Sequence, residues 1–146
     1  MKNQFSKNYL PKILSIIMLG CSVTLGPITA FANETKVSLT GAEETPPVKT
    51  SAKGIGSISV NKDKSVTGMV TTTGLAGTLA HIHLGAEGKK GPPIITLVKS
   101  GDSGWVVPPR SILTDDQYAS YKAGNLYINV HSAENKDGEI RGQLKP

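Results

Sequence analysis

Short runs of β-branched residues and glycine, separated by turn residues, recur along most of this 146-residue chain. Val, Ile and Thr favour the pleated backbone of a strand, whereas clusters of Gly, Pro, Asn and Asp mark the turns between strands. The alternation of apolar and polar residues slips within residues 54–60, and a β-bulge at Gly56 would explain this slip. We therefore expect an all-β fold with strands at residues 36–40, 54–60, 65–72, 80–84, 94–98, 125–131 and 139–144.

Turn and capping signals predict how these strands are connected. The polar segments 61–64 and 135–138 predict hairpins, and the second contains an Asp-Gly pair suited to positive φ. Thr114 begins a Thr-x-x-Gln capping box, and Gly124 provides a C-terminal stop, so one short helix lies between them. Together these patterns predict an antiparallel β-sandwich with one short helix.

The first 32 residues have the features of a secretory signal peptide. Lysines at positions 2, 7 and 12 precede an apolar stretch at 13–25, which is too short and too interrupted to span a bilayer. Ala-Phe-Ala at 30–32 is an A-x-A cleavage motif. We expect cleavage after Ala32, which leaves residues 33–146 as one secreted, extracellular domain with no membrane span.

Cys21 opens a rival route, in which the chain becomes a lipoprotein anchored through this residue. Leu19 fits the lipidation motif poorly, so the sequence favours simple secretion, and a retained membrane anchor is the third alternative. Cys21 is the only cysteine of the chain, so residues 33–146 have neither a disulfide nor a thiolate ligand. We expect the domain to depend on its sheet core.

Charge argues against a nucleic-acid partner. The whole chain carries a net charge of +5, but three of its 16 basic residues and none of its 11 acidic residues lie in the predicted leader. The remaining chain is almost balanced and has no basic run; Lys89 and Lys90 form only a pair within a predicted loop.

All three histidines lie in two of the predicted strands. His81 and His83 flank Ile82, so in a strand both imidazoles point to one face, and His131 lies on the polar side of its own strand. If the two strands share a sheet, the three imidazoles converge into an open three-ligand site for copper or zinc. Glu139 is expected as a fourth ligand or as an outer support.

Asn129 and Arg141 lie on the same polar face and are further candidates for support of the metal site. A purely structural role is the competing interpretation of this face. Histidine and arginine side chains often hydrogen-bond to a loop backbone, and the glycine-rich segment 85–91 follows the histidine pair directly. Both interpretations stay open at this point.

Four segments of the chain, in order, resemble the CHRD family of domains, which is named after chordin and is also found in secreted bacterial proteins. The matching segments are Leu-Thr-Gly-Ala-Glu-Glu-Thr-Pro-Pro-Val at 39–48, Ala-His-Ile-His at 80–83, Ala-Gly-Asn-Leu-Tyr-Ile-Asn-Val-His at 123–131 and Gly-Glu-Ile-Arg-Gly-Gln at 138–143. The resemblance implies an immunoglobulin-like or superoxide-dismutase-like β-sandwich. It does not imply a particular activity.

The sequence leads to three hypotheses about function. The first is a secreted, non-catalytic binding module with a three-histidine metal site and an extracellular or cell-surface partner. The second is a copper-dependent redox protein or enzyme that uses the same histidines, because His-Ile-His is similar to the copper-binding strand of Cu,Zn superoxide dismutase. That enzyme family, however, uses more than three histidines and a disulfide. The third is a passive structural protein of the cell envelope.

Overall fold

Nine strands, one short α-helix and one 3-10 turn make up the regular structure of residues 34–146, the part of the chain that the computed structural model describes. In chain order, the elements are β1 (Glu34–Thr40), η1 (Gly41–Glu43), β2 (Lys53–Val60), β3 (Val66–Thr73), β4 (Gly77–Leu84), β5 (Pro93–Thr96), β6 (Val98–Ser100), β7 (Gly104–Val106), α1 (Asp115–Lys122), β8 (Leu126–Ser132) and β9 (Ile140–Leu144).

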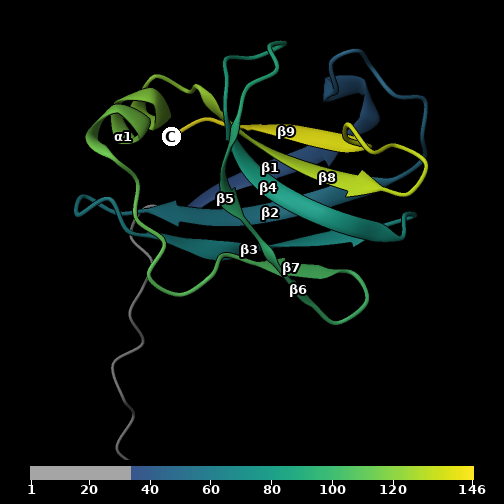
Figure 1. Ribbon diagram of the computed structural model, residues 1–146, viewed down its shortest axis with the longest axis horizontal. Helices are drawn as coiled ribbons and strands as arrows, with labels where there is room; N and C mark the ends of the chain where they lie inside the picture. The colour runs from purple at the N-terminus through teal and green to yellow at the C-terminus, as the bar shows by residue number, and fades with distance from the viewer. Residues whose placement is uncertain (1–33) are drawn as a thin grey trace, which may run out of the picture.

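The strands form one antiparallel sheet that nearly closes on itself. Its order is β5-β4-β8-β9-β1-β2-β3-β7-β6, so its two ends are β5 and β6. These two strands are separated in the chain by Leu97 alone, whose N–H donates to the carbonyl oxygen of Ala80 at 2.9 Å. Figure 1 shows this segment running from the β4 side of the molecule to the β7 side. The predicted antiparallel all-β class with one short helix is confirmed.

The core lies between the β4-β8-β9 part of the sheet and the β1-β2-β3 part. Ile128 and Val130 of β8 are fully buried there, as is Ile58 of β2. Burial of each such side chain contributes about 1.5–3 kcal/mol relative to its exposed state. The polar face of β4, β8 and β9 is therefore the opposite one, where loops cover it.

The bulge expected at Gly56 is absent from the register of residues 34–146. Gly56 pairs in unbroken register with Val37 on one side and Val70 on the other. A Cβ atom on Gly56 would lie 2.5 Å from Cγ1 of Val37 and 3.0 Å from Cδ1 of Ile128. The prediction was wrong because Gly56 faces the core, where neighbouring side chains fill the space that its own side chain would take.

The segment predicted as one strand at 94–98 is two strands, β5 and β6, and β7 was not predicted. Leu97 is buried between β5 and β6, and its side chain enters the core as the chain passes from one strand partner to another. All three residues of β6 are exposed, so this strand lacks the apolar alternation that marks a half-buried strand.

The helix and both hairpin turns are confirmed. Thr114 caps α1 through a reciprocal pair of hydrogen bonds with Gln117, in which the Gln117 N–H donates to Thr114 Oγ1 at 3.2 Å. Gly124 adopts φ +73° after the helix, and Gly138 adopts φ +134° at the end of the second turn. In the first turn, the N–H of Lys64 donates to the carbonyl oxygen of Asn61 at 2.9 Å.

The predicted leader at 1–32, its cleavage after Ala32 and the alternative lipidation of Cys21 fall outside the described residues. Within residues 34–146, no helix is long and apolar enough to cross a membrane.

Candidate metal centre

The three histidines meet on the polar face of two paired strands. His81 and His83 lie on β4 and His131 lies on β8; Leu79, two residues before His81, is the register partner of His131. One potential ligand atom from each imidazole lies within 4.8 Å of the other two. The closest approach, 3.0 Å, is between Nδ1 of His81 and Nε2 of His131. The convergence predicted from the alternation of residues is therefore present.

Backbone carbonyl groups orient two of the three rings. Nδ1 of His83 lies 2.9 Å from the carbonyl oxygen of Gly91, and Nδ1 of His131 lies 2.8 Å from that of Lys136. A carbonyl oxygen can only accept, so each Nδ1 carries the hydrogen and each Nε2 keeps its lone pair. Nε2 of His83 is buried and has no hydrogen-bond partner among residues 34–146. Orientation of a ligand histidine through its second nitrogen is common in metal sites.

The surroundings of His81 and His83 favour the neutral form of these two imidazole rings. Burial lowers the pKa of His81, and the neighbouring rings of His131 and His83 lower it further. Burial is also the main cause of a lowered pKa at His83, and it outweighs the opposite effect of the contact with Gly91. Neutral imidazole is the form that binds metals, so protons compete weakly for these nitrogens at neutral pH.

A stack of three side chains supports the ring of His83. The ring of Tyr127 lies parallel to it with a centroid separation of 4.7 Å, and the guanidinium carbon of Arg141 lies 3.6 Å from the Tyr127 ring centroid. Arg141 is only 2% exposed and donates to the carbonyl oxygens of Ala86 and Lys89, at 3.0 and 2.9 Å. Arg141 thus fixes the 85–91 loop, in agreement with the structural interpretation of this face.

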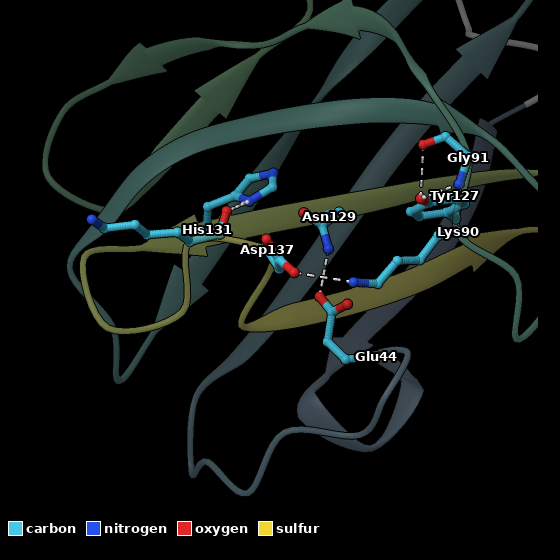
Figure 2. Close-up of polar contacts among 8 residues, drawn as sticks. Glu44, Lys90, Gly91, Tyr127, Asn129, His131 and Asp137 are labelled. Carbon is cyan, nitrogen blue, oxygen red and sulfur yellow. Dashed lines mark hydrogen bonds and ion pairs between the residues drawn. The ribbon is translucent and has the colours of Figure 1, made fainter.

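Asn129 makes its main contact away from the imidazoles. Its Nδ2 donates to Oε1 of Glu44 at 2.5 Å, as Figure 2 shows, while its buried Oδ1 finds no hydrogen-bond partner in the described part of the chain. Burial raises the pKa of Glu44 to about 7, although Arg141, the backbone of Thr45 and Lys90 partly oppose this effect. The sequence analysis did not identify Glu44 as part of this face, because it directly follows the 3-10 turn η1 and lies outside the alternating pattern of any strand.

Glu139 does not belong to the metal-ligand group. Among residues 34–146, the group of close ligand atoms contains the three histidines and no carboxylate. The Glu139 carboxylate accepts a hydrogen bond from Thr50 at 2.7 Å. Burial alone would raise the pKa of Glu139, but hydrogen bonds from Ser132, Thr50 and Asn135 hold it below its ordinary value. A carboxylate with these partners is already satisfied without a metal.

The fold and this face define an antiparallel β-sheet module with a cluster of three histidines and a buried arginine that fixes the loop above them. The chain belongs to the CHRD domain family, whose model matches residues 35–144. No curated protein and no solved structure matches the chain. The resemblance inferred from the four sequence segments is confirmed.

Proposed function

We propose that this chain is an exported, non-catalytic binding module that holds one copper or zinc ion between His81, His83 and His131. The observation that carries the proposal is the meeting of three imidazole nitrogens within 4.8 Å of one another. Membership of the CHRD family supports a binding module. Its partner would be an extracellular or cell-surface molecule.

The residues fit such an ion. Zinc and copper both accept imidazole nitrogen, and three nitrogen ligands leave a position for water or a small molecule. Nε2 of His83 is a buried lone pair with no hydrogen-bond partner among residues 34–146, and a metal ion would satisfy it. A bound ion would also take the place of the hydrogen that lies between Nδ1 of His81 and Nε2 of His131.

A copper-dependent redox role is the second candidate. His83 and His131 are buried whereas His81 is half-buried, so an ion held between them would have a protein side and a solvent side. Access from solvent is what a small substrate would need. The two candidates separate experimentally, because only the redox protein would oxidise or reduce a substrate at the copper-loaded site.

We also infer that the nearly closed sheet is a two-layered sandwich of the immunoglobulin-like or superoxide-dismutase-like kind. The junction of the two layers would lie between β9 and β1, which share the single register pair Thr40–Arg141. Export by a leader at residues 1–32 remains part of the proposal. A passive envelope protein, the third candidate, would bind neither metal nor partner.

The test is an equilibrium titration of the purified protein with Zn²⁺, Cu²⁺ and Cu⁺, beside the His81→Ala variant. His81 is half-buried, so its replacement should leave the fold intact. We expect one ion per chain and a loss of metal affinity of at least about 100-fold in the variant. Loss of a residue that only hydrogen-bonds to a metal ligand already lowers metal affinity by about 10–100-fold. Equal binding by both proteins would contradict the proposal.

A further inference from the structure

The loop at residues 133–138 lies between the three histidines and a pocket. On one side of the loop, Nδ1 of His131 donates to the carbonyl oxygen of Lys136. On its other side is a pocket of about 380 Å³, which all six residues of the loop line together with Glu44, Thr45, Pro46, Val48 and Lys90. The same short segment therefore contacts a candidate metal ligand and forms one wall of the pocket.

The hydrogen bond from His131 to Lys136 exists only when Nδ1 is the nitrogen of the His131 ring that carries the hydrogen. Nε2 of His131 faces Nδ1 of His81 at 3.0 Å, and in the conformation seen it accepts a hydrogen from that atom, because the hydrogen of the His131 ring is on Nδ1. In the protein without a metal, a second tautomer competes with this one, in which Nε2 of His131 donates to Nδ1 of His81. If Nε2 of His131 carries the hydrogen, Nδ1 has none to donate and the bond to Lys136 is lost. A metal on Nε2 excludes this tautomer, because a ligand nitrogen carries no hydrogen, and so it enforces the bond to the loop.

The end of the loop closes directly over the pocket floor. A Cβ atom on Gly138 would lie 2.1 Å from Nδ2 of Asn129 and 2.6 Å from Oε1 of Glu44, so the Gly138 backbone is in close contact with that hydrogen-bonded pair. Glu44 is 7% exposed beneath it. A shift of the loop at Lys136, two residues away, would therefore open the pocket above Glu44.

The opposite wall of the pocket, loop 85–91, is held by bonds that need no metal. Gly91 of this loop accepts from Nδ1 of His83, whose Nε2 has no competing partner among residues 34–146. Arg141 fixes loop 85–91 through two carbonyl groups, and Lys90 of that loop forms an ion pair with Asp137 at 3.1 Å. Figure 2 shows the Lys90 side chain reaching over Glu44 to Asp137. The ion pair thus joins the loop that depends on His131 to a loop that does not.

We propose that a metal ion at the three histidines holds loop 133–138 closed over the Glu44 pocket. The inference rests on the proposed metal binding. Coupling of this kind is reciprocal: whatever stabilises the closed loop also raises the affinity for the metal. The Lys90–Asp137 ion pair is then a positioning contact for a metal site that neither residue touches.

The test uses the full-chain protein and Zn²⁺, which has no redox chemistry of its own. Hydrogen exchange is measured with and without zinc, and zinc affinity is measured for wild type, Asp137→Asn and Glu87→Gln. The last variant is the control, because the Glu87–Lys145 pair has a similar length of 2.9 Å and is also exposed, but does not hold loop 133–138.

We expect zinc to slow exchange of the Gly138 amide about ten-fold and to leave that of Lys89, in the loop held by Arg141, unchanged. Because exposed ion pairs are weak, Asp137→Asn should lower zinc affinity only about two- to five-fold, with no change in Glu87→Gln. Zinc binding without any protection of residues 133–138 would overturn the coupling and leave the metal site standing. A failure of zinc to bind would instead overturn the proposed function, and the coupling with it.

Discussion

His83 and His131 each give their Nδ1 hydrogen to a backbone carbonyl group, and this contact determines which nitrogen remains for a metal. The residue types were readable from the sequence, since alternation placed all three imidazoles on one face. The carbonyl partners were not, because they belong to loops whose path depends on the folded sheet. Burial of Glu44 was equally hidden, as its partner Asn129 is 85 positions away.

Replacement of Glu44 by Gln tests its burial through the pH dependence of stability. The folded-state pKa of about 7 lies above the ordinary value of 4.5, so the folded state holds the proton more tightly. The contribution of the Glu44 proton to the free energy of unfolding is fully present below pH 4.5 and is lost as the pH rises through 7. We expect wild type to lose about 2–3 kcal/mol between pH 4.5 and 8 that Glu44→Gln does not lose, as measured by urea unfolding. The exposed neighbour provides the control: Glu43→Gln should keep the wild-type slope, and a wild-type slope in Glu44→Gln would refute this account.

Gly138 is predicted to tolerate no side chain. It combines φ +134° with side-chain atoms of Asn129 and Glu44 that lie closer than 3 Å to the position of a Cβ. We expect Gly138→Ala to lower the free energy of unfolding by about 3 kcal/mol. Gly88 also has positive φ, at +70°, but no atom of residues 34–146 lies within 4 Å of its Cβ position, so Gly88→Ala should cost only about 1–2 kcal/mol. Equal losses in the two variants would show that the Gly138 site is not tightly packed.

At the scale of elements, the longer strands with a buried face were predictable and the two three-residue strands, β6 and β7, were not. β1, β2, β3, β4, β8 and β9 all follow runs of alternating or apolar residues that the sequence displays. β6 and β7 are three residues long, and their existence depends on pairing with each other and with β3. Such pairing leaves little trace in a local pattern.

The unbroken register of β2 has a direct test. In Gly56→Ala the new methyl group would enter the core, 2.5 Å from Val37, and we expect a loss of about 1–3 kcal/mol through overpacking. Ile55, its neighbour on the same strand, is 67% exposed, so Ile55→Ala should change stability by less than about 0.5 kcal/mol. Chemical denaturation measures both. A neutral Gly56→Ala would instead favour a bulge at this position.

The capping box of α1 is a second element that can be tested alone. Thr114→Ala removes the side-chain acceptor of the Gln117 N–H, and we expect a loss of about 1 kcal/mol. Ser120→Ala, within the same helix, should be neutral or slightly stabilising because alanine has the higher helix propensity. Thermal unfolding of the two variants gives the comparison, and an unchanged Thr114→Ala would mean that the cap contributes nothing.

At the scale of the whole molecule, a core on one face of the sheet leaves the other face of β4, β8 and β9 free for polar chemistry. Two interpretations of that face were open from the sequence, and the structure supports part of each. Arg141 fixes a loop, as a structural network requires, while one potential ligand atom of each imidazole lies within 4.8 Å of the other two. The family match covers residues 35–144 and says nothing of the chemistry, which depends on these side chains.

X-ray absorption spectroscopy of the protein loaded with one equivalent of zinc tests the central claim most directly. The account predicts three imidazole ligands with zinc–nitrogen distances of about 2.0–2.1 Å, completed by water or a small ligand. His81→Ala should show one imidazole fewer. A spectrum with oxygen ligands alone, identical in wild type and His81→Ala, would contradict the assignment of these histidines to a metal.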